Sequence, residues 1–294
     1  MLKNDIPLVQ ASETELATAV QTNLFALFRT MATILPGGEL VEGGNLNRHH
    51  TFPTNPMFKG VWGTNLLPDE IDEAIEETID WYRTRNAPFF FWWTGPGATP
   101  ADLGAHLQAR GLLDMAEQQQ ELAAGIRQTD QGAPGMVADL NQMDISLLAK
   151  TPPGFVIKAV SDEKELYHFK RVFVETYEIP DWAGQAWVDA TQCVGIRQSP
   201  WRMFVGYLDN EPVATNMLFT GAGVASVYAV ATIPTAQRKG IGAAITLKPL
   251  LDAREMGYQY GVLFSTEMGI PVYQRIGFRL TGERINRYLW RNED

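Results

Sequence analysis

The length, composition and charge of this chain are those of a folded protein of about two domains, and they exclude some classes of partner. Its 294 residues are 45% apolar and 20% charged, which is enough for two domains of ordinary size. The formal net charge of −10 lies wholly in the first half, with 9 Lys+Arg against 19 Asp+Glu up to residue 150 and 15 against 15 after it. An acidic surface argues against nucleic acid as a partner, because phosphate binding needs a clustered basic face.

Patterns in the first half predict strands around a helix. A short strand is expected around residues 60–62. Residues 69–80 hold seven carboxylates and three isoleucines at four-residue spacing, which predicts an amphipathic helix with a solvated outer face. The aromatic run Phe89–Trp93 predicts a buried strand. Turn formers dominate residues 128–136, which form the clearest break in the chain.

From residue 154 onward, after the break Thr151–Gly154, the expected elements follow one another without interruption. In chain order they are a strand at 155–160, helices at 162–177 and 181–194, strands at 202–208, 212–220 and 225–233, a helix at 241–257, a strand at 260–265, a short helix ending at Gly277, and strands near 279–280 and 284–290. Pro249 lies inside the helix 241–257, where it cannot donate a hydrogen bond to Ile245. We expect a kink there.

The most informative stretch is a basic, glycine-bearing turn between the strand 225–233 and the helix 241–257. Its residues are Gln237, Arg238, Lys239, Gly240, Ile241, Gly242 and Ala243. The glycines allow the backbone to approach a ligand closely, and the N–H groups of a helix start favour an anion. The pattern is not the phosphate loop of NTPases, because the basic residues precede the first glycine. It is not the dinucleotide fingerprint either, because Ile245 stands where Gly or Ala is needed.

Two motifs in this half resemble those of one enzyme family. Gln237–Gly242 resembles the Gln/Arg-x-x-Gly-x-Gly/Ala signature of the GNAT superfamily of N-acetyltransferases. Residues 260–278, which end in Tyr273-x-x-x-Gly-Phe, look like the second half of that family's cofactor site. The element order over residues 154–290 is also similar to the family's. The resemblance implies acetyl-CoA as acyl donor, with its pyrophosphate at the turn.

The resemblance also implies roles for the strand that precedes the turn and for Tyr273. Val230, Ala231 and Thr232 would offer backbone groups to the pantetheine arm, and an N–H near Ala231 would polarise the thioester carbonyl. Tyr273 falls on the family's general acid. A phenol with a reference pKa of ~10 keeps its proton until a thiolate, with a reference pKa of ~8.5, has formed. The alternative is a tyrosine of the core.

The general base has no fixed position in the family. Glu267, just after the strand 260–265, is our first candidate. Glu175 and Glu178, at the end of the helix 162–177, are two others. Each of the three is also readily explained as a surface charge.

The first half contains a motif similar to one in the second half, because Leu107–Leu112 has the spacing of Tyr273–Phe278. The corresponding turn, Gly63–Glu70, has no Gly-x-Gly and no basic residue, and its carboxylates would repel a phosphate. We therefore expect a degenerate, catalytically silent GNAT-like unit; the alternative is a helical domain with a chance match. The expected division is a degenerate N-terminal domain at 1–135, a connecting segment at 136–153 and a catalytic GNAT domain at 154–294.

Together these features predict an α+β fold, with a mixed, mostly antiparallel sheet flanked by helices, in two GNAT-like units. The expected activity is transfer of an acetyl group from acetyl-CoA to a primary amine of a small molecule or peptide, without a metal. The alternative is a non-catalytic acyl-CoA-binding or sensor protein. With no apolar run long enough to span a membrane and Cys193 as its single cysteine, the chain is expected in the cytoplasm, with no membrane partner.

Overall fold

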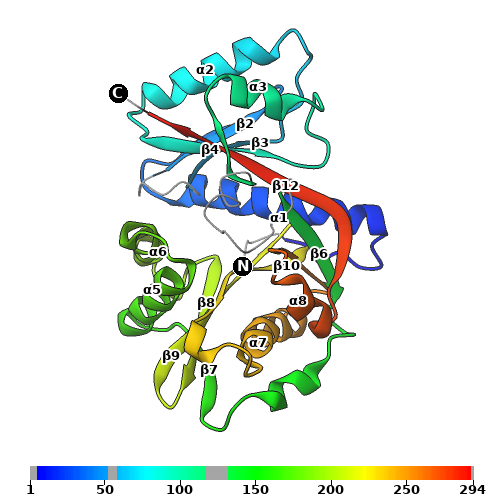
Figure 1. The fold of residues 1–294 in the computed structure, drawn as a ribbon, viewed down its shortest axis with the longest axis vertical. Coiled ribbons are helices and arrows are strands. Elements are labelled where there is room, and N and C mark those ends of the chain that lie inside the picture. The colour runs from blue at the N-terminus through cyan, green and yellow to red at the C-terminus, as the bar shows by residue number, and fades with distance from the viewer. Residues whose placement is uncertain (1–4, 52–57, 117–131, 293–294) are drawn as a thin grey trace. The chain divides into compact units, whose positions relative to one another are not determined.

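The computed structural model describes residues 5–51, 58–116 and 132–292 (Figure 1). Its elements are α1 Glu13–Ile34, β1 Glu39–Val41, β2 Asn47–His50, β3 Lys59–Trp62, α2 Ile71–Arg83, β4 Phe89–Thr94, α3 Leu103–Ala109, β5 Leu113–Asp114, β6 Ala133–Asp139, the 3₁₀ helix η2 Ile145–Lys150, β7 Phe155–Ala159, α5 Glu163–Tyr177, α6 Asp181–Val194, β8 Trp201–Leu208, β9 Glu211–Gly221, β10 Val224–Thr232, the 3₁₀ helix η3 Pro234–Ala236, α7 Ile241–Glu255, β11 Tyr260–Phe264, α8 Ile270–Ile276 and β12 Arg279–Arg291. The mixed, mostly antiparallel pairing with flanking helices confirms the expected fold class.

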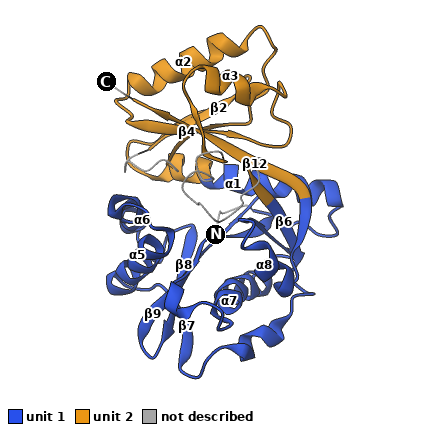
Figure 2. Cartoon of the chain, viewed as in Figure 1, with its two compact units in different colours: residues 1–27, 135–281 blue, residues 28–134, 282–294 orange. Residues whose placement is uncertain are grey.

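The chain forms two compact units (Figure 2). Unit 1 contains residues 1–27 and 135–281, and unit 2 contains residues 28–134 and 282–294. Each unit therefore takes two separate stretches of the chain.

The sheet of unit 1 has the strand order β6-β11-β10-β9-β8-β7. Its strands pair antiparallel, except β10 and β11, which run parallel. Figure 1 shows α5 and α6 on one side of these strands and α7 and α8 on the other. Successive side chains of β10 point to opposite faces of the sheet. Ala225 and Val227 pack in the core with α7, whereas Val224 packs against Val20 of α1.

The sheet of unit 2 has the strand order β1-β2-β3-β4-β12. The three isoleucines of the predicted acidic helix are buried on one face of α2, where they pack with Val61 of β3 and Trp92 of β4. The amphipathic helix and the buried aromatic strand predicted in the first half are thus confirmed.

The composition of the two units differs from the domain boundaries expected from the sequence. The expected connecting segment 136–153 contains most of β6, which pairs with β11 over Gly135–Asp139. The first turns of α1 belong to unit 1, because Leu16, Ala19 and Val20 pack in its core. The two final strands expected near 279–280 and 284–290 are one continuous strand, β12.

Three elements before residue 51, namely α1, β1 and β2, carry no prediction from the sequence. Part of the expected break at 128–136 lies outside the described residues.

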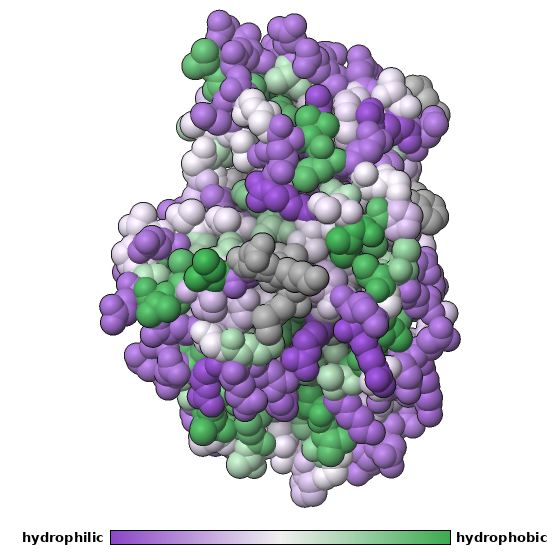
Figure 3. Space-filling view, turned by 180° about the vertical axis from the view of Figure 1, so that it is seen from behind, coloured by the Kyte–Doolittle hydropathy of each residue, from purple (hydrophilic) through white to green (hydrophobic). Residues whose placement is uncertain are grey.

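On the face shown in Figure 3, hydrophobic side chains form small groups among hydrophilic ones. Among the described helices, none combines the length and apolar character that crossing a membrane requires.

Candidate active site

The candidate site begins where β10 and β11 part. Among the described residues, these parallel strands pair only at Ala225 with Gly261 and at Ser226 with Val262. β10 then continues to Thr232 along β9, with a register shift between Tyr228 and Ala231. Ala229 has a φ of 49° at this bulge. The bulge bends β10, and none of the described strands pairs with its other edge beyond Ser226.

The ladder with β9 decides which backbone groups of β10 face this open edge. The N–H of Ile233 donates to the Val213 carbonyl at 3.0 Å, and Ala231 lies opposite Thr215. Because residues of an antiparallel pair alternate in the direction of their hydrogen bonds, the backbone groups of Ala231 point to β9. Those of Val230 and Thr232 point to the open edge.

Two side chains reach the carbonyls on that edge. The Tyr177 hydroxyl, at the end of α5, donates to the Val230 carbonyl at 3.0 Å. The Gln237 side-chain amide donates to the Thr232 carbonyl at 3.0 Å. Gln237 therefore ties the glycine-bearing turn to the strand before it.

The turn itself leads into α7 through a glycine that the chain requires. Gly240 is the N-cap residue with a φ of 78°, and a Cβ there would lie 2.6 Å from the Lys150 carbonyl oxygen. Gly242 is different, because the nearest atom to a Cβ there would be the Thr232 hydroxyl at 3.7 Å. Gly242 is thus not demanded by a protein contact, and space lies beside it at the start of the helix.

This helix start can bind an anion. The N-cap Gly240 supplies no side-chain hydrogen bond, and the N–H groups of Ile241, Gly242 and Ala243 have no acceptor within the helix. Arg238 is exposed beside them, while the Lys239 ammonium donates to the Thr235 carbonyl at 2.9 Å. The donors and the neighbouring cations suit a phosphate or pyrophosphate group.

Tyr273 lies on α8, the short helix after β11. Its ring contacts Phe278 edge-on, with centroids 5.9 Å apart, and packs against the core of unit 1. Burial, and secondarily the nearby Tyr177, raises the pKa of Tyr273 well above its usual value. The phenol therefore keeps its proton at neutral pH.

The three candidate bases lie at two places. Glu267 is partly exposed in the turn Thr266–Gly269 that precedes α8. Glu175 and Glu178 are exposed at the end of α5, where Glu178 adopts a left-handed conformation.

The comparison with known families agrees with this architecture. Residues 164–278 match the acetyltransferase (GNAT) family. These residues are a GNAT acetyltransferase domain. This match supports an acyltransferase activity for the domain. No curated protein sequence matches the chain.

Solved structures show the same fold over nearly the whole chain. A GCN5-related N-acetyltransferase from Kribbella flavida is 15% identical with a TM-score of 0.65, over 97% of each chain. A GCN5-related N-acetyltransferase from Sphaerobacter thermophilus is 13% identical with a TM-score of 0.58, over 96% of this chain and 94% of the other. A tandem GNAT protein from the clavulanic acid biosynthesis pathway is 14% identical with a TM-score of 0.55, over 98% and 99%.

Within its described residues, unit 2 shows no comparable opening at the corresponding strands of its sheet. After the parallel pairing of β3 with β4, the chain beyond β3 stays joined to the loop after β4. The Thr99 N–H donates to the Thr64 carbonyl at 3.0 Å, and the Leu66 N–H donates to the Thr99 carbonyl at 3.2 Å. Trp92 also donates to the Thr64 hydroxyl at 2.9 Å. Leu107, the counterpart of Tyr273, is fully buried in the core.

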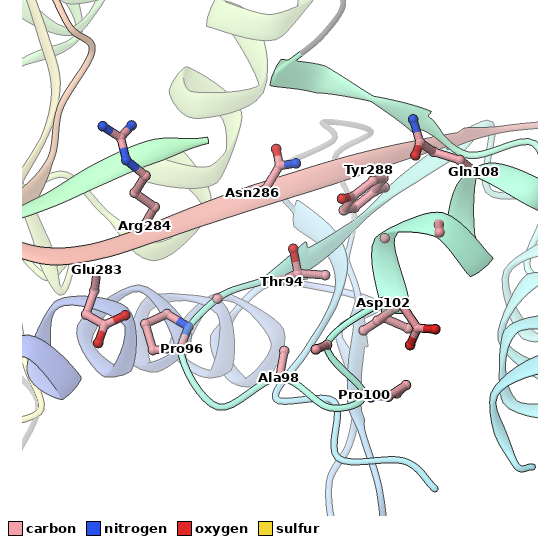
Figure 4. Close-up of a pocket in the computed structure, with 15 residues that line it drawn as sticks. Thr94, Pro96, Ala98, Pro100, Asp102, Gln108, Glu283, Arg284, Asn286 and Tyr288 are labelled. Carbon is pink, nitrogen blue, oxygen red and sulfur yellow. The ribbon is translucent and has the colours of Figure 1, made fainter. Parts of the chain in front are cut away.

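A separate hollow of about 520 Å³ lies within unit 2, between the loop after β4, the start of α3 and β12. Figure 4 shows Glu283 and Arg284 at one end of it and Asp102 and Gln108 at the other. The described residues that line it include none of the predicted GNAT site residues. It is therefore distinct from the opening between β10 and β11.

Two residues beside the GNAT site carried no role in the sequence analysis. Tyr177 is separated from Val230 by 53 residues, and Lys150 reaches Gly240 from η2. Neither belongs to a motif. Their contacts arise from the ends of α5 and η2, so periodicity gives no signal for them.

Proposed function

We propose that the protein transfers an acetyl group from acetyl-CoA to a primary amine of a small molecule or peptide. The observation that supports this most is the parting of β10 from β11 directly before a glycine-bearing helix start. The opening gives room for an extended arm, and the helix start gives a place for its pyrophosphate. A cytoplasmic setting, with no nucleic acid or membrane partner, is part of the proposal.

The residues proposed to hold the donor form one continuous path. The N–H groups of Ile241, Gly242 and Ala243, with Arg238 and Lys239 nearby, would bind the pyrophosphate. The Val230 and Thr232 backbone groups would pair with the amide groups of the pantetheine arm. Because Ala231 points to β9, the N–H that polarises the thioester carbonyl is proposed to be that of Val230 rather than of Ala231.

Acetyl-CoA supplies a thioester carbonyl and a thiolate leaving group. The neutral amine forms a bond to the carbonyl carbon, and its proton leaves to a base, for which Glu267 is the first candidate. As the carbon–sulfur bond breaks, Tyr273 gives its proton to the departing thiolate. The raised pKa of Tyr273 supports this role, because the phenol is still protonated when the thiolate forms.

A substitution at Gly242 tests the proposed CoA-binding site, and a substitution at Tyr273 tests the proposed general acid. Gly242→Asp places a carboxylate at the helix start and should abolish CoA binding in calorimetry. Gly242→Ala is the matched control, because its methyl group fits 3.7 Å from the Thr232 hydroxyl and should leave the fold intact. Tyr273→Phe should keep CoA affinity and lower kcat by about 10²-fold or more.

Turnover is measured as free-thiol release with a panel of amines. Unchanged CoA affinity in Gly242→Asp would refute the binding site. Tight CoA binding without transfer to any amine would instead favour the alternative, an acyl-CoA sensor.

A further inference from the structure

We propose that Thr215, on β9, is the positioning residue for the backbone N–H that polarises the thioester carbonyl. Its hydroxyl holds the peptide between Ala229 and Val230 so that the Val230 N–H points into the opening beside β10. The inference deepens the proposed function and rests on it.

The peptide that Thr215 contacts is the one that supplies this N–H. The Thr215 hydroxyl donates to the Ala229 carbonyl at 2.9 Å. The Ala229 carbonyl and the Val230 N–H belong to one planar trans peptide, in which they point in opposite directions. Because the carbonyl points toward Thr215 on β9, the N–H points away from β9, to the edge of β10 that faces the opening.

Ala229 needs such a support because its backbone conformation is unusual. Tyr228 of β10 lies opposite Met217 of β9. The next registered pair, Ala231 with Thr215, leaves two residues of β10 opposite one of β9. Ala229 takes up the extra length with a φ of 49°, a left-handed conformation that glycine normally supplies at such a bulge. An alanine there is strained, so a neighbouring contact has to hold it in place.

Thr215 is well placed to give that support. It is fully buried, so water does not compete for its hydroxyl. Its backbone pairs with Ala231 and its side chain reaches Ala229, so one residue holds β10 on both sides of Val230. A hydrogen bond to the carbonyl also polarises the peptide and strengthens its N–H as a donor. Thr215 therefore acts through Val230 and does not need to touch the substrate.

Variants at Thr215 separate this role from a general effect on stability. Thr215→Val keeps the shape of the side chain and removes the hydroxyl. We expect it to lower kcat by about tenfold to a hundredfold, which is less than the complete loss of such a donor costs. The affinity for CoA in calorimetry should stay unchanged, because CoA has no thioester carbonyl and the start of α7 is unaltered. Thr215→Ser retains the hydroxyl and should restore most of kcat.

Thr220→Val is the matched control, because Thr220 is a buried threonine of the same strand and its side chain hydrogen-bonds to Tyr258. It should keep the wild-type kcat, and thermal unfolding checks that each variant is folded. A wild-type kcat in folded Thr215→Val would overturn the inference. An equal loss of kcat in Thr220→Val would also overturn it, because it would show a general effect of losing a buried hydroxyl.

Infrared spectroscopy of bound acetyl-CoA, with an isotope label at the thioester carbonyl, tests the role without an amine. In the wild type the N–H weakens the carbonyl bond, so the stretching band should lie at lower frequency than in free acetyl-CoA. Thr215→Val should move the band back toward its free position, a result that supports the inference even if no amine is acetylated. An identical band in the wild type and Thr215→Val would overturn it. A wild type that does not bind acetyl-CoA would refute the proposed function itself, and this inference with it.

Discussion

At the scale of single residues, Lys59 is the charged side chain whose burial has the clearest energetic consequence. It is 1% exposed on β3, and its ammonium donates to the Thr51 carbonyl at 3.2 Å. Burial lowers the pKa of Lys59 from 10.5 to about 8. The unfolded chain therefore binds more protons than the folded protein between about pH 8 and 10.5, so this residue makes stability rise with pH in that window.

Replacing Lys59 with Met should remove the free-energy cost of burying its charged ammonium group. Below pH 8 the lysine is charged in both states, and its burial penalty, on the order of 3 kcal/mol, is fully present. We expect Lys59→Met to unfold at higher urea than the wild type at pH 7, with the advantage shrinking by pH 10. Lys164→Met, at an exposed position on α5, should show no such change. A pH-independent difference for Lys59→Met would contradict the assignment.

The residues of the candidate site divide into those that motifs reveal and those that only the fold brings in. The turn Gln237–Ala243 is local, so its spacing alone predicted a helix start with free donors. The orientation of Ala231 toward β9 depends on the register of a ladder with residues about 16 positions earlier in the chain. The contact of Tyr177 with Val230 depends on where α5 ends, and no sequence motif contains Tyr177.

At the scale of elements, α7 shows how a proline can stand inside a helix. The helix runs unbroken from Ile241 to Glu255 through Pro249. Pro249 has no N–H to donate to the Ile245 carbonyl. That carbonyl instead accepts a hydrogen bond at 2.9 Å from the side-chain amide of Asn216 on β9. The missing backbone donor is thus replaced by a buried side chain that also ties α7 to the sheet. The expected kink remains a prediction.

Asn216 and Pro249 should be energetically coupled. Asn216→Ala leaves the buried Ile245 carbonyl without this donor and should destabilise the protein by about 1–3 kcal/mol. In a Pro249→Ala background the helix regains its own N–H donor, and the same Asn216 substitution should cost about 1 kcal/mol less. Urea unfolding of the two single variants and the double variant measures the coupling. Equal costs in both backgrounds would show that Asn216 does not compensate for the proline.

Periodicity predicted the elements with one buried face and missed those defined by pairing. The isoleucines of α2 and the apolar positions of α7 recur at helical spacing within a single helix, so the sequence alone predicts both helices. β6 begins with Ala133, Pro134 and Gly135, which are typical of a loop, and becomes a strand through its register with β11. Such pairing over more than 100 residues leaves no local signal.

At the scale of the whole molecule, each unit completes its sheet with a strand that follows the other unit in the chain. β6 comes after the body of unit 2 and pairs with β11 of unit 1. The main part of β12 comes after the body of unit 1 and pairs with β4 of unit 2. Boundaries placed by motif position separate these strands from their partners, which is why the expected domains and the compact units differ.

This exchange predicts that residues 28–134 do not form a stable unit alone. Tyr288, Leu289 and Trp290 of β12 lie opposite Trp92, Phe91 and Phe90 of β4 and are buried. Without them β4 has an exposed aromatic edge, which favours aggregation. Residues 28–134 joined through a Gly/Ser linker to 282–294 should unfold cooperatively and show near-ultraviolet circular dichroism from packed tryptophans. The same chimera with residues 288–290 replaced by glycine should show neither property. Cooperative unfolding of residues 28–134 alone would demonstrate that unit 2 does not need β12.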